Sequence, residues 1–418
     1  MKASLLIKNV RQLLTLSSNI KGPRIGKQME DLGIIENGAV AVKGEKIIAV
    51  GKTEEVLAKI KIDKNSKVIN AKGKVLSPGF VDPHTHPVFA RTREEEFELR
   101  IRGKSYKEIA QAGGGIKSSV RELRKRTEEE LIELTLPRLD NFLSYGTTTI
   151  EAKSGYGLSL EDEIKTLKVI KRLNKLHPID LIPTFLGAHE VPDEYRDKKY
   201  KYIDLIVNKM IPEVVRRKLA VFCDVFCEEG VFDLKESEKI LKAAKKFGLK
   251  PRIHAEQLSS FGGAELAGKV KAISADHLEQ VSDRGIEAMK KSKVIAILLP
   301  GATFGLGLKK YAPARKMIES GLPLALATDF NPGSSMTESM PMILSLACVM
   351  MRMTPAEAIC ASTINSAYAV DRGKDSGSLE VGKKADIILW DVRNYKEIPY
   401  HYGMNLVCKV IKDGKVVR

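Results

Sequence analysis

The chain has 418 residues, of which 43% are hydrophobic and 29% are charged, with a single Trp. This length exceeds one ordinary small domain, and the composition is typical of a soluble globular protein and excludes a disordered or fibrous one. No apolar run approaches the roughly 20 residues of a membrane helix, and the N-terminal MKASLLIKNV lacks the apolar stretch of a signal peptide. We therefore expect two structural units, a large core, a cytoplasmic location and no membrane partner.

The formal net charge of +16 raises the question of nucleic-acid binding. The basic residues are interleaved with acidic ones on predicted helix faces, in KTLKVIKRLNKL, KILKAAKKFGLK and EAMKKSKV, and no aromatic platform for bases accompanies them. We expect a solvated helix exterior and no nucleic-acid partner. Such a surface can still steer a small anion towards the protein.

The five cysteines form an odd and scattered set, which is typical of a reducing compartment, so disulfides are not predicted. Cys223 and Cys227 lie in the apolar run LAVFCDVFCEEG without a second pair nearby. Buried strand thiols are therefore favoured over a zinc knuckle.

Both chain ends carry short β-like pieces and turns, GAVAVKGEKIIAVG and KVINAKGKV at the start, GSLEVGKKADIILWD and NLVCKVIKDGKVV at the end. Runs of this length with turn residues between them indicate β-strands. We predict that residues 1–74 and 370–418 together form one small β-sandwich domain.

Between about residues 75 and 330, short apolar runs alternate with amphipathic helical stretches, which indicates βα units around a parallel sheet. The eight runs are VLSPGFVD, GTTTIEA, DLIPTFLGA, LAVFCDVF, PRIHAE, AISADH, VIAILLP and PLALATD. They are nearly all apolar, as expected of strands buried on both faces. Eight strands favour a TIM-like (β/α)8 barrel over residues 75–369. An open doubly wound sheet is the alternative, but no glycine-rich phosphate fingerprint follows the first strand.

Residues 90–145 are predicted to be a helical insertion after the first strand. The segment TEEELIELTLPRLDNFLSYG has helical periodicity, and AQAGGGIKSS has the composition of a loop. Long loops at the active face of a barrel usually serve the substrate. The sequence leaves open whether this segment moves as a lid.

The strongest chemical signal is PGFVDPHTHP, in which His84 and His86 follow an apolar strand. Residues i and i+2 of an extended segment point to one side, so both imidazoles can reach a single ion. Later strands end in His254 (PRIHAEQ), His277 (AISADHLEQ) and Asp329 (LALATDFNPG). All strand ends of a barrel open onto the same rim, so these residues are expected to converge.

Three imidazoles and a carboxylate suit one divalent ion such as zinc, ferrous iron or manganese, with a position left for water. We expect the ligands to be His84, His86, His254 and Asp329. Glu256 lies on the same side of its strand as His254 and is the candidate general base, while Asp329 could combine ligation with proton transfer. His277 could be a fifth ligand, but a neighbouring role that polarises the substrate carbonyl is favoured.

This arrangement resembles the amidohydrolase superfamily and, within it, the imidazolonepropionase family. The resemblance covers almost the whole chain and rests on PHTHPVFARTRE, AGGGI, KSGYGL, GAHEVP, HAEQ, ADH and TDFNPGSS. It implies hydrolysis of 4-imidazolone-5-propanoate, a small anionic cyclic amide, to N-formimidoyl-L-glutamate in histidine degradation. It also implies one Zn or Fe ion and a homodimer.

One departure concerns the number of ions. The binuclear branch of the superfamily places a carboxylated lysine after strand four, where this chain reads VFCDVFCEEGVFDLK. No lysine stands at that strand end, which favours one ion, although Glu228 or Glu229 could bridge a second.

The resemblance implies that Arg93, in ARTRE, grips the propanoate carboxylate through a fork-like pair of hydrogen bonds, with Tyr106 and Tyr156 as hydroxyl donors. Arg91 lies two residues earlier and is the alternative for this contact, and only its position in the motif disfavours it. The remaining implied contacts are to the ring, from His189 and Gln257, and to the amidine or the new carboxylate, from Asn331, Gly333 and Ser334. Asn-Pro-Gly could equally form a turn that touches no ligand, and Tyr156 between two glycines could be a turn residue.

Two alternatives stay open. Another amidohydrolase, such as a nucleobase deaminase or a dihydroorotase-like cyclic amidase, would share the metal site, but a neutral base needs no carboxylate clamp of the kind that Arg93, Tyr106 and Tyr156 form. A non-catalytic relative that serves as a binding or assembly module should have lost ligands, whereas the full set is present here.

Overall fold

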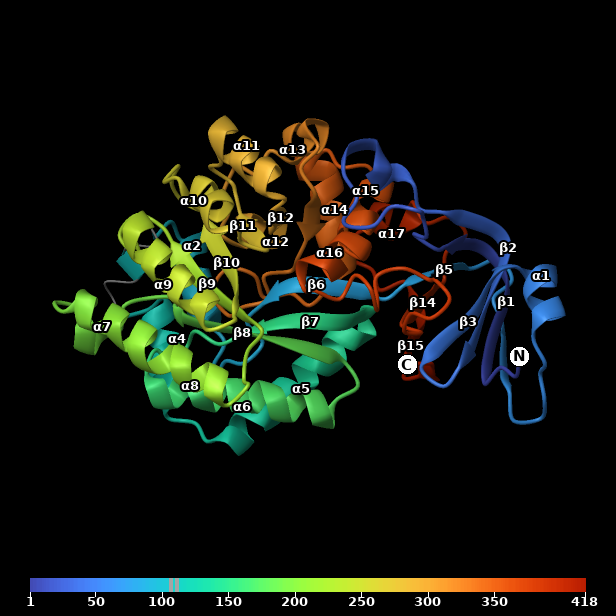
Figure 1. The fold of residues 1–418 in the computed structure, drawn as a ribbon, viewed down its shortest axis with the longest axis horizontal. Helices are drawn as coiled ribbons and strands as arrows, with labels where there is room; N and C mark the ends of the chain where they lie inside the picture. The colour runs from blue at the N-terminus through green and yellow to red at the C-terminus, as the bar shows by residue number, and fades with distance from the viewer. Residues whose placement is uncertain (105–107, 110–112) are drawn as a thin grey trace.

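The computed structural model describes residues 1–104, 108–109 and 113–418. Two sheets organise the chain: an eight-stranded parallel barrel surrounded by helices, and a separate mixed sheet to which both chain ends contribute. Figure 1 shows the barrel on one side of the molecule and the terminal sheet, with the N- and C-termini, on the other. The predicted fold class is thereby confirmed.

The barrel strands pair in chain order, each parallel to the next. They are β6 (Phe80–Thr85), β7 (Thr147–Lys153), β8 (Asp180–Ala188), β9 (Phe222–Cys227), β10 (Lys250–Ala255), β11 (Ser274–His277), β12 (Ile295–Leu298) and β13 (Leu324–Leu326). The segment after β13 closes the ring on β6, because the N–H of His86 donates to the carbonyl of Phe330 over 2.8 Å. Each of the eight predicted runs overlaps one of these strands.

The first predicted run, VLSPGFVD, is two strands instead of one. β5 (Val75–Pro78) pairs with β1 (Leu5–Leu14) and β14 (Ile387–Trp390) in the terminal sheet, and only β6 belongs to the barrel. The chain changes sheets at Gly79, whose N–H donates to the carbonyl of Asp386, while the N–H of Phe80 donates to that of Gly146. β5 thus lies beyond the predicted domain boundary at residue 74.

Helices cover the outside of the barrel (Figure 1). They are α2 (Glu94–Ile101), α4 (Ile116–Arg124), α5 (Glu128–Ser144), α6 (Leu160–Leu176), α7 (Lys199–Leu205), α8 (Ile211–Arg216), α9 (Leu234–Lys246), α10 (Gly263–Val270), α11 (Asp283–Ser292), α12 (Pro300–Gly305), α13 (Ala314–Ser320), α14 (Met340–Met351) and α15 (Pro355–Ala361). The predicted helical segments correspond to α5, α6, α9 and α11. The predicted loop AQAGGGIKSS ends earlier than expected, because α4 begins at Ile116.

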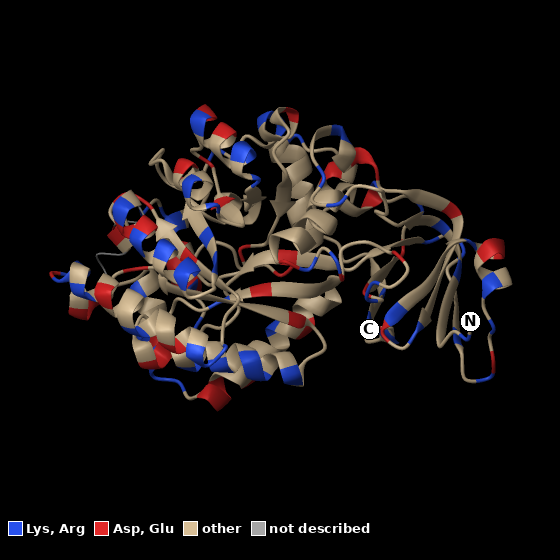
Figure 2. Ribbon diagram, viewed as in Figure 1, with Lys and Arg blue, Asp and Glu red and all other residues tan. Residues whose placement is uncertain are grey.

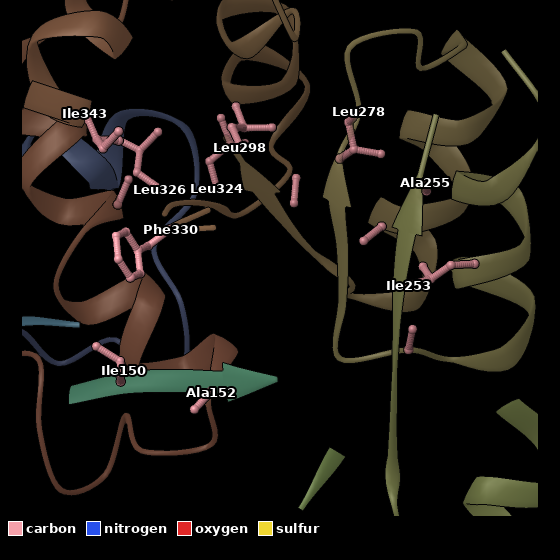
Figure 3. Close-up of a cluster of buried hydrophobic side chains, with 14 of the residues drawn as sticks. Ile150, Ala152, Ile253, Ala255, Leu278, Leu298, Leu324, Leu326, Phe330 and Ile343 are labelled. Atoms are coloured by element: carbon pink, nitrogen blue, oxygen red, sulfur yellow. The ribbon is translucent and has the colours of Figure 1, made fainter. Parts of the chain in front are cut away.

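Alternate side chains of the barrel strands meet different surroundings. One set joins the hydrophobic cluster that packs the strands against the outer helices, as Figure 3 shows for Ile150 and Ala152 of β7 and for Ile253 and Ala255 of β10. The side chains between and beside them are Glu151, Lys153, Arg252 and His254, and all of these are buried. Since successive residues of a strand face opposite sides, these polar groups lie inside the barrel. The strands are buried on both faces, but the inner face of several is polar.

The short helix α16 (Ile364–Ala369) closes the amino-terminal mouth of the barrel. Ala367 and Val370 form a buried cluster with residues near the starts of three strands, Val81, Ile182 and Phe222. The barrel interior is therefore sealed at the end opposite to the strand ends that carry the candidate site.

The terminal sheet is built around β1. Its strand order is β16-β15-β14-β5-β1-β2-β3, with β4 also paired to β1. The strands not yet given bounds are β2 (Ile34–Lys43), β3 (Lys46–Lys52), β4 (Lys67–Asn70), β15 (Val407–Lys412) and β16 (Lys415–Val416), and two short helices, α1 (Thr53–Lys59) and α17 (Glu397–Tyr400), accompany them. Leu5 and Ile7 pack in one hydrophobic cluster and Leu6 in another, so both faces of the sheet are covered.

The surface carries mixed charge. Figure 2 shows Lys and Arg interleaved with Asp and Glu on the outer helices. Cys223 and Cys227 are buried free thiols in β9. Among the described residues, no helix combines the length and apolar character that crossing a membrane requires.

A buried lysine connects the two units. Nζ of Lys412, on β15, lies 3.0 Å from Oδ2 of Asp180 at the start of β8, 3.0 Å from Oδ2 of Asp386 and 3.2 Å from Oδ2 of Asp413. Lys412 is 2% exposed. Burial opposes its charged form, but the three carboxylates outweigh this effect and raise the pKa of Lys412.

Lys412→Met is expected to lower the free energy of unfolding by about 3 kcal/mol, because removing one partner of a buried ion pair leaves uncompensated buried charge. Urea denaturation followed by circular dichroism measures the change. Lys415→Met, at an exposed position of β16, is the control and should shift stability by less than about 0.5 kcal/mol. Equal stability of the two variants would show that the Lys412 cluster does not hold the units together.

Candidate metal centre and active site

The predicted metal ligands and His277 lie together at the carboxyl ends of the barrel strands. Ligand atoms of His84, His86 and Asp329 lie within 4.8 Å of one another, and those of His84, His254 and His277 form a second such group. In the first group, Oδ1 of Asp329 is 3.5 Å from Nε2 of His84 and 3.6 Å from Nε2 of His86. His84 is common to both groups.

The geometry fits a divalent ion. Ligand atoms held about 2.0–2.1 Å from one tetrahedral ion are about 3.4 Å apart, close to the separations between Asp329 and the two imidazoles. Nε2 of His84 is buried and has no hydrogen-bond partner among the described residues. Burial lowers the pKa of His84 and His86 well below the usual range, so both rings are neutral, which is the form that binds metals.

His254 and His277 complete the cluster. The ring centroid of His254 lies 4.5 Å from that of His84, 5.8 Å from that of His86 and 5.3 Å from that of His277. His277 belongs to the same group of ligand atoms as His254. Its assignment as a neighbour of the ion, and not a ligand, therefore stays a prediction.

Three candidate catalytic residues have left-handed backbone conformations. The φ angles are 55° for Glu256, 81° for His277 and 51° for Asp329, each at or just after the end of a different strand. This conformation costs a non-glycine residue about 1–2 kcal/mol, and such outliers gather at functional sites, where the surroundings enforce them. The strain supports a functional role for this rim.

The two carboxylate oxygens of Glu256 have different surroundings. Its Oε1 accepts a hydrogen bond from the N–H of Gly262 over 3.1 Å, whereas Oε2 is buried without a partner among the described residues. Burial raises the pKa of Glu256 to about 7, although the hydrogen bond from Gly262 opposes the shift. The next residue, Gln257, is half-buried.

His189 and Tyr156 flank His86. The rings of His189 and His86 are stacked with centroids 5.2 Å apart, and the Tyr156 ring lies 5.4 Å from His189. Nδ1 of His189 is 2.9 Å from the carbonyl oxygen of Gly155, and since a carbonyl only accepts, Nδ1 carries the proton. Burial lowers the pKa of His189 to about 3, so the ring is neutral and Nε2 presents a lone pair.

Arg93 precedes α2 and is already paired. Its Nη2 donates to Oε2 of Glu96 over 2.5 Å, while Nε is buried without a partner among the described residues. Both carboxylate oxygens of Glu96 also accept the N–H of Gly115, at 3.2 and 3.3 Å. A Cβ atom at Gly333 would lie 2.4 Å from Nη1 of Arg93, so a larger residue there would displace the guanidinium group. Tyr106 lies outside the described residues.

A cavity of about 530 Å³ adjoins Arg93, Gly333 and Ser334. Its lining also includes five large hydrophobic side chains, Phe97, Phe304, Met336, Met342 and Leu346. Oγ of Ser334 is 3.5 Å from Oδ2 of Asp329, so this residue connects the cavity with the metal cluster.

Asn331 shapes the loop between Asp329 and Ser334. Its Oδ1 accepts the N–H groups of Gly333 and Ser334, each over 2.8 Å. Its Nδ2 donates to the carbonyl of Asp329 over 2.6 Å and to Oγ of Ser334 over 2.8 Å. The amide is thus engaged within the turn, and the predicted contact between Asn331 and the substrate stays a prediction.

Sequence reasoning missed the charged residues beneath the imidazoles. They are Glu151, Lys153, Asp224, Arg252 and Asp276, all of them fully buried on barrel strands. The signal that could have found them is the alternation of charged and apolar residues in IEAK, FCDVF, PRIHA and SADH.

Residues 111–418 match the family described as the amidohydrolase family. Two solved structures share the fold over 99% of this chain: an adenosine deaminase from Xanthomonas campestris with bound Zn (TM-score 0.73, 17% identity, 93% of that chain) and the guanine deaminase of E. coli (TM-score 0.76, 14% identity, 98% of that chain). The family match places the chain among the amidohydrolases, and the two structures show that the barrel fold is shared.

Curated relatives are more similar. The imidazolonepropionase of Alkaliphilus metalliredigens (strain QYMF) is 50% identical over 419 residues, which cover 100% of this chain and 98% of the relative. That of Geobacillus kaustophilus (strain HTA426) is 51% identical over 415 residues, which cover 99% and 97%. The chain belongs to the amidohydrolase family and, within it, to the family of the imidazolonepropionases.

Proposed function

We propose that the chain hydrolyses the cyclic amide C–N bond of 4-imidazolone-5-propanoate and so forms N-formimidoyl-L-glutamate, a step of histidine degradation. The observation that carries the proposal is an identity of about 50% to imidazolonepropionases over the whole chain. The convergence of the predicted polar residues at one barrel rim supports it.

One divalent ion, Zn or Fe, is the proposed cofactor, held by His84, His86, His254 and Asp329. When bound, it supplies an activated water and polarises the carbonyl that is attacked. The neutral state of His84 and His86 supports this assignment, as does Nε2 of His84, which has no hydrogen-bond partner in the described part of the chain.

Glu256 carries the proton in this proposal. Its buried Oε2 has no partner among the described residues, so it can accept a proton from the attacking water. As the oxygen of water bonds to the carbonyl carbon and the C–N bond breaks, Glu256 returns that proton to the leaving ring nitrogen. His277 donates a hydrogen bond to the carbonyl oxygen, and Asp329 assists the proton transfer.

The remaining side chains orient the substrate. His189 has its lone pair on Nε2 and is suited to accept a hydrogen bond from a ring N–H, and Gln257 follows Glu256 on the same segment. Arg93, with hydroxyls from Tyr156 and Tyr106, binds the propanoate. Gly333 and Ser334 receive the amidine or the new carboxylate beside the cavity.

The test is the loss of ultraviolet absorbance of freshly prepared 4-imidazolone-5-propanoate. We expect turnover that disappears after chelation and returns with zinc or ferrous iron, each supplied separately to identify the more effective ion. A folded, metal-loaded protein that leaves the absorbance unchanged would overturn the proposal. Deaminase and cyclic-amide substrates would then be tried in its place.

Arg93→Ala is expected to raise KM roughly 10- to 100-fold with little change in kcat, since a hydrogen bond to a charged group contributes about 1.5–3 kcal/mol. Steady-state kinetics measures both constants. Arg91→Ala is the matched control, because the Arg91 side chain is 57% exposed and pairs with Glu95 at the surface. If both variants keep the wild-type KM, the carboxylate clamp lies elsewhere.

A further inference from the structure

A buried lysine lies beneath the candidate metal centre. Lys153 ends β7, and its side chain is 0% exposed. Nζ lies 2.7 Å from Oδ2 of Asp224, 2.9 Å from Oε1 of Glu151 and 3.8 Å from Oδ2 of Asp276. An ammonium group without solvent requires such partners, because an isolated buried charge is strongly destabilising.

Two of these carboxylates also meet the candidate ligands. Oδ2 of Asp276 is 2.6 Å from Nδ1 of His84, and Oδ2 of Asp224 is 3.0 Å from Nδ1 of His254. In both cases the oxygen that faces the imidazole is the oxygen that faces Lys153. Each imidazole is thus connected to Lys153 through a single carboxylate oxygen.

The hydrogen bond between Asp276 and Nδ1 of His84 selects one tautomer of that ring, and the contact of Asp224 with Nδ1 of His254 favours the same tautomer there. A carboxylate beside Nδ1 favours the proton on that nitrogen, which leaves the lone pair of Nε2 for a metal ion. Nε2 of His84 is the atom that approaches Oδ1 of Asp329.

Arg252 shares the carboxylate of Asp276 with Lys153 but has no ion pair with Asp224 among the described residues. Its Nη2 lies 3.3 Å from Oδ2 of Asp276, but it also donates to the carbonyl of Pro83 over 2.6 Å, and Nη1 donates to the carbonyl of Ala369 at the end of α16. Among the ion pairs of the described residues, only Lys153 reaches both Asp224 and Asp276.

We propose that Lys153 is a positioning residue for the metal centre: it fixes the carboxylates of Asp224 and Asp276, which set the tautomer and orientation of His254 and His84. The inference rests on the metal site of the proposed function. Lys153 contributes no ligand of its own, and its effect reaches the ion through the two carboxylates.

The test variant is Lys153→Met, which keeps an unbranched side chain and removes the charge. Metal is first removed from the protein with a chelator. The dissociation constant for zinc, measured by competition with a chromophoric chelator, is then expected to be about 10- to 100-fold higher than that of wild type. Lys412→Met removes another buried lysine that contacts several carboxylates and is the matched control. Lys412 pairs with Asp180 at the start of β8, the end of that strand opposite to the rim. The control variant should bind zinc within about twofold of wild type despite its lower stability.

A second measurement reports the tautomer itself. The sample is zinc-loaded wild-type protein labelled with 15N-histidine. Its two-bond 15N–1H spectra should show that the rings of His84 and His254 are protonated at Nδ1. The signals of the two rings are assigned by their loss in His84→Ala and His254→Ala. Lys153→Met should weaken or average these signals. If Lys153→Met does not fold, Asp224→Asn and Asp276→Asn, which preserve side-chain volume, are measured in its place and should each bind zinc more weakly.

The outcomes separate the two proposals. Wild-type zinc affinity in folded Lys153→Met, or in both asparagine variants, would overturn the positioning role and leave the metal site intact. Failure of wild type to bind zinc, or equal affinity in wild type and His84→Ala, would overturn the proposed metal site instead.

Discussion

Asp329→Asn is expected to reduce kcat/KM by at least about 10⁴-fold, because it removes an anionic ligand and a participant in proton transfer at once. The substitution removes the negative charge next to both imidazoles, because Oδ1 of Asp329 lies 3.5 Å from Nε2 of His84 and 3.6 Å from Nε2 of His86. Zinc content after gel filtration should fall together with the activity. Steady-state kinetics and metal analysis on the same preparation measure the two effects.

Asparagine is the informative substitution at this position. The backbone of Asp329 has φ 51°, a conformation that Asn tolerates better than Ala, so Asp329→Asn should keep the melting temperature of the metal-free protein. Asp283→Asn, on the exposed start of α11, is the control and should keep activity and metal. An active Asp329→Asn protein in metal-free buffer would contradict the proposed mechanism.

Glu256→Gln is expected to lower kcat by about 10²- to 10⁴-fold, the usual contribution of a general acid or base, while zinc affinity and KM stay near wild type. Gln retains an oxygen for the N–H of Gly262, so the local structure should persist. What is lost is the ability of the buried Oε2 position to accept and return a proton. Single-turnover kinetics shows whether the chemical step is the one that slows.

Glu265→Gln provides the comparison for this variant. Glu265 is an acid on the neighbouring helix α10 whose Oε1 accepts a hydrogen bond from Ser282, and its negative charge helps to raise the pKa of Glu256. Its replacement should change kcat less than about threefold. If both variants lose activity equally, the loss reflects the negative charge of this region and not a proton carried by Glu256.

Metal binding and proton transfer are thus tested independently. Asp329→Asn should lose both the ion and the activity, whereas Glu256→Gln should lose the activity alone. Lys153→Met should weaken the binding of the ion, although Asp329 and Glu256 are both still present. A different order of effects would reassign the roles within the cluster.

Several features of the fold followed from local patterns. Helix caps such as Thr127 with Glu130, whose side chains exchange hydrogen bonds with each other's backbone N–H, mark boundaries that depend on neighbouring residues alone. The split of VLSPGFVD could not be predicted, because an apolar run carries no mark of which sheet its two halves join. That assignment depends on β1 and β14, which are distant in the sequence.

The predicted substrate contacts also depend on tertiary structure that the sequence does not reveal. The sequence suggested Arg93 for a carboxylate, but its pairing with Glu96 and its close approach to Gly333 depend on loops that meet only in the folded chain. The engagement of Asn331 in its own turn was open as an alternative, and only the structure shows where its donors and acceptors lie.

The sequence by itself determined the barrel and the gathering of His84, His86, His254, His277 and Asp329 at one rim. The physical reason is that strand period and barrel topology send every strand end to the same side. The tertiary structure alone decided how the buried charges beneath that rim are paired. Lys153, Asp224 and Asp276 come from three different strands. Charges so far apart in the sequence form specific ion pairs only in the folded barrel, whose interior excludes water and so strengthens their attraction.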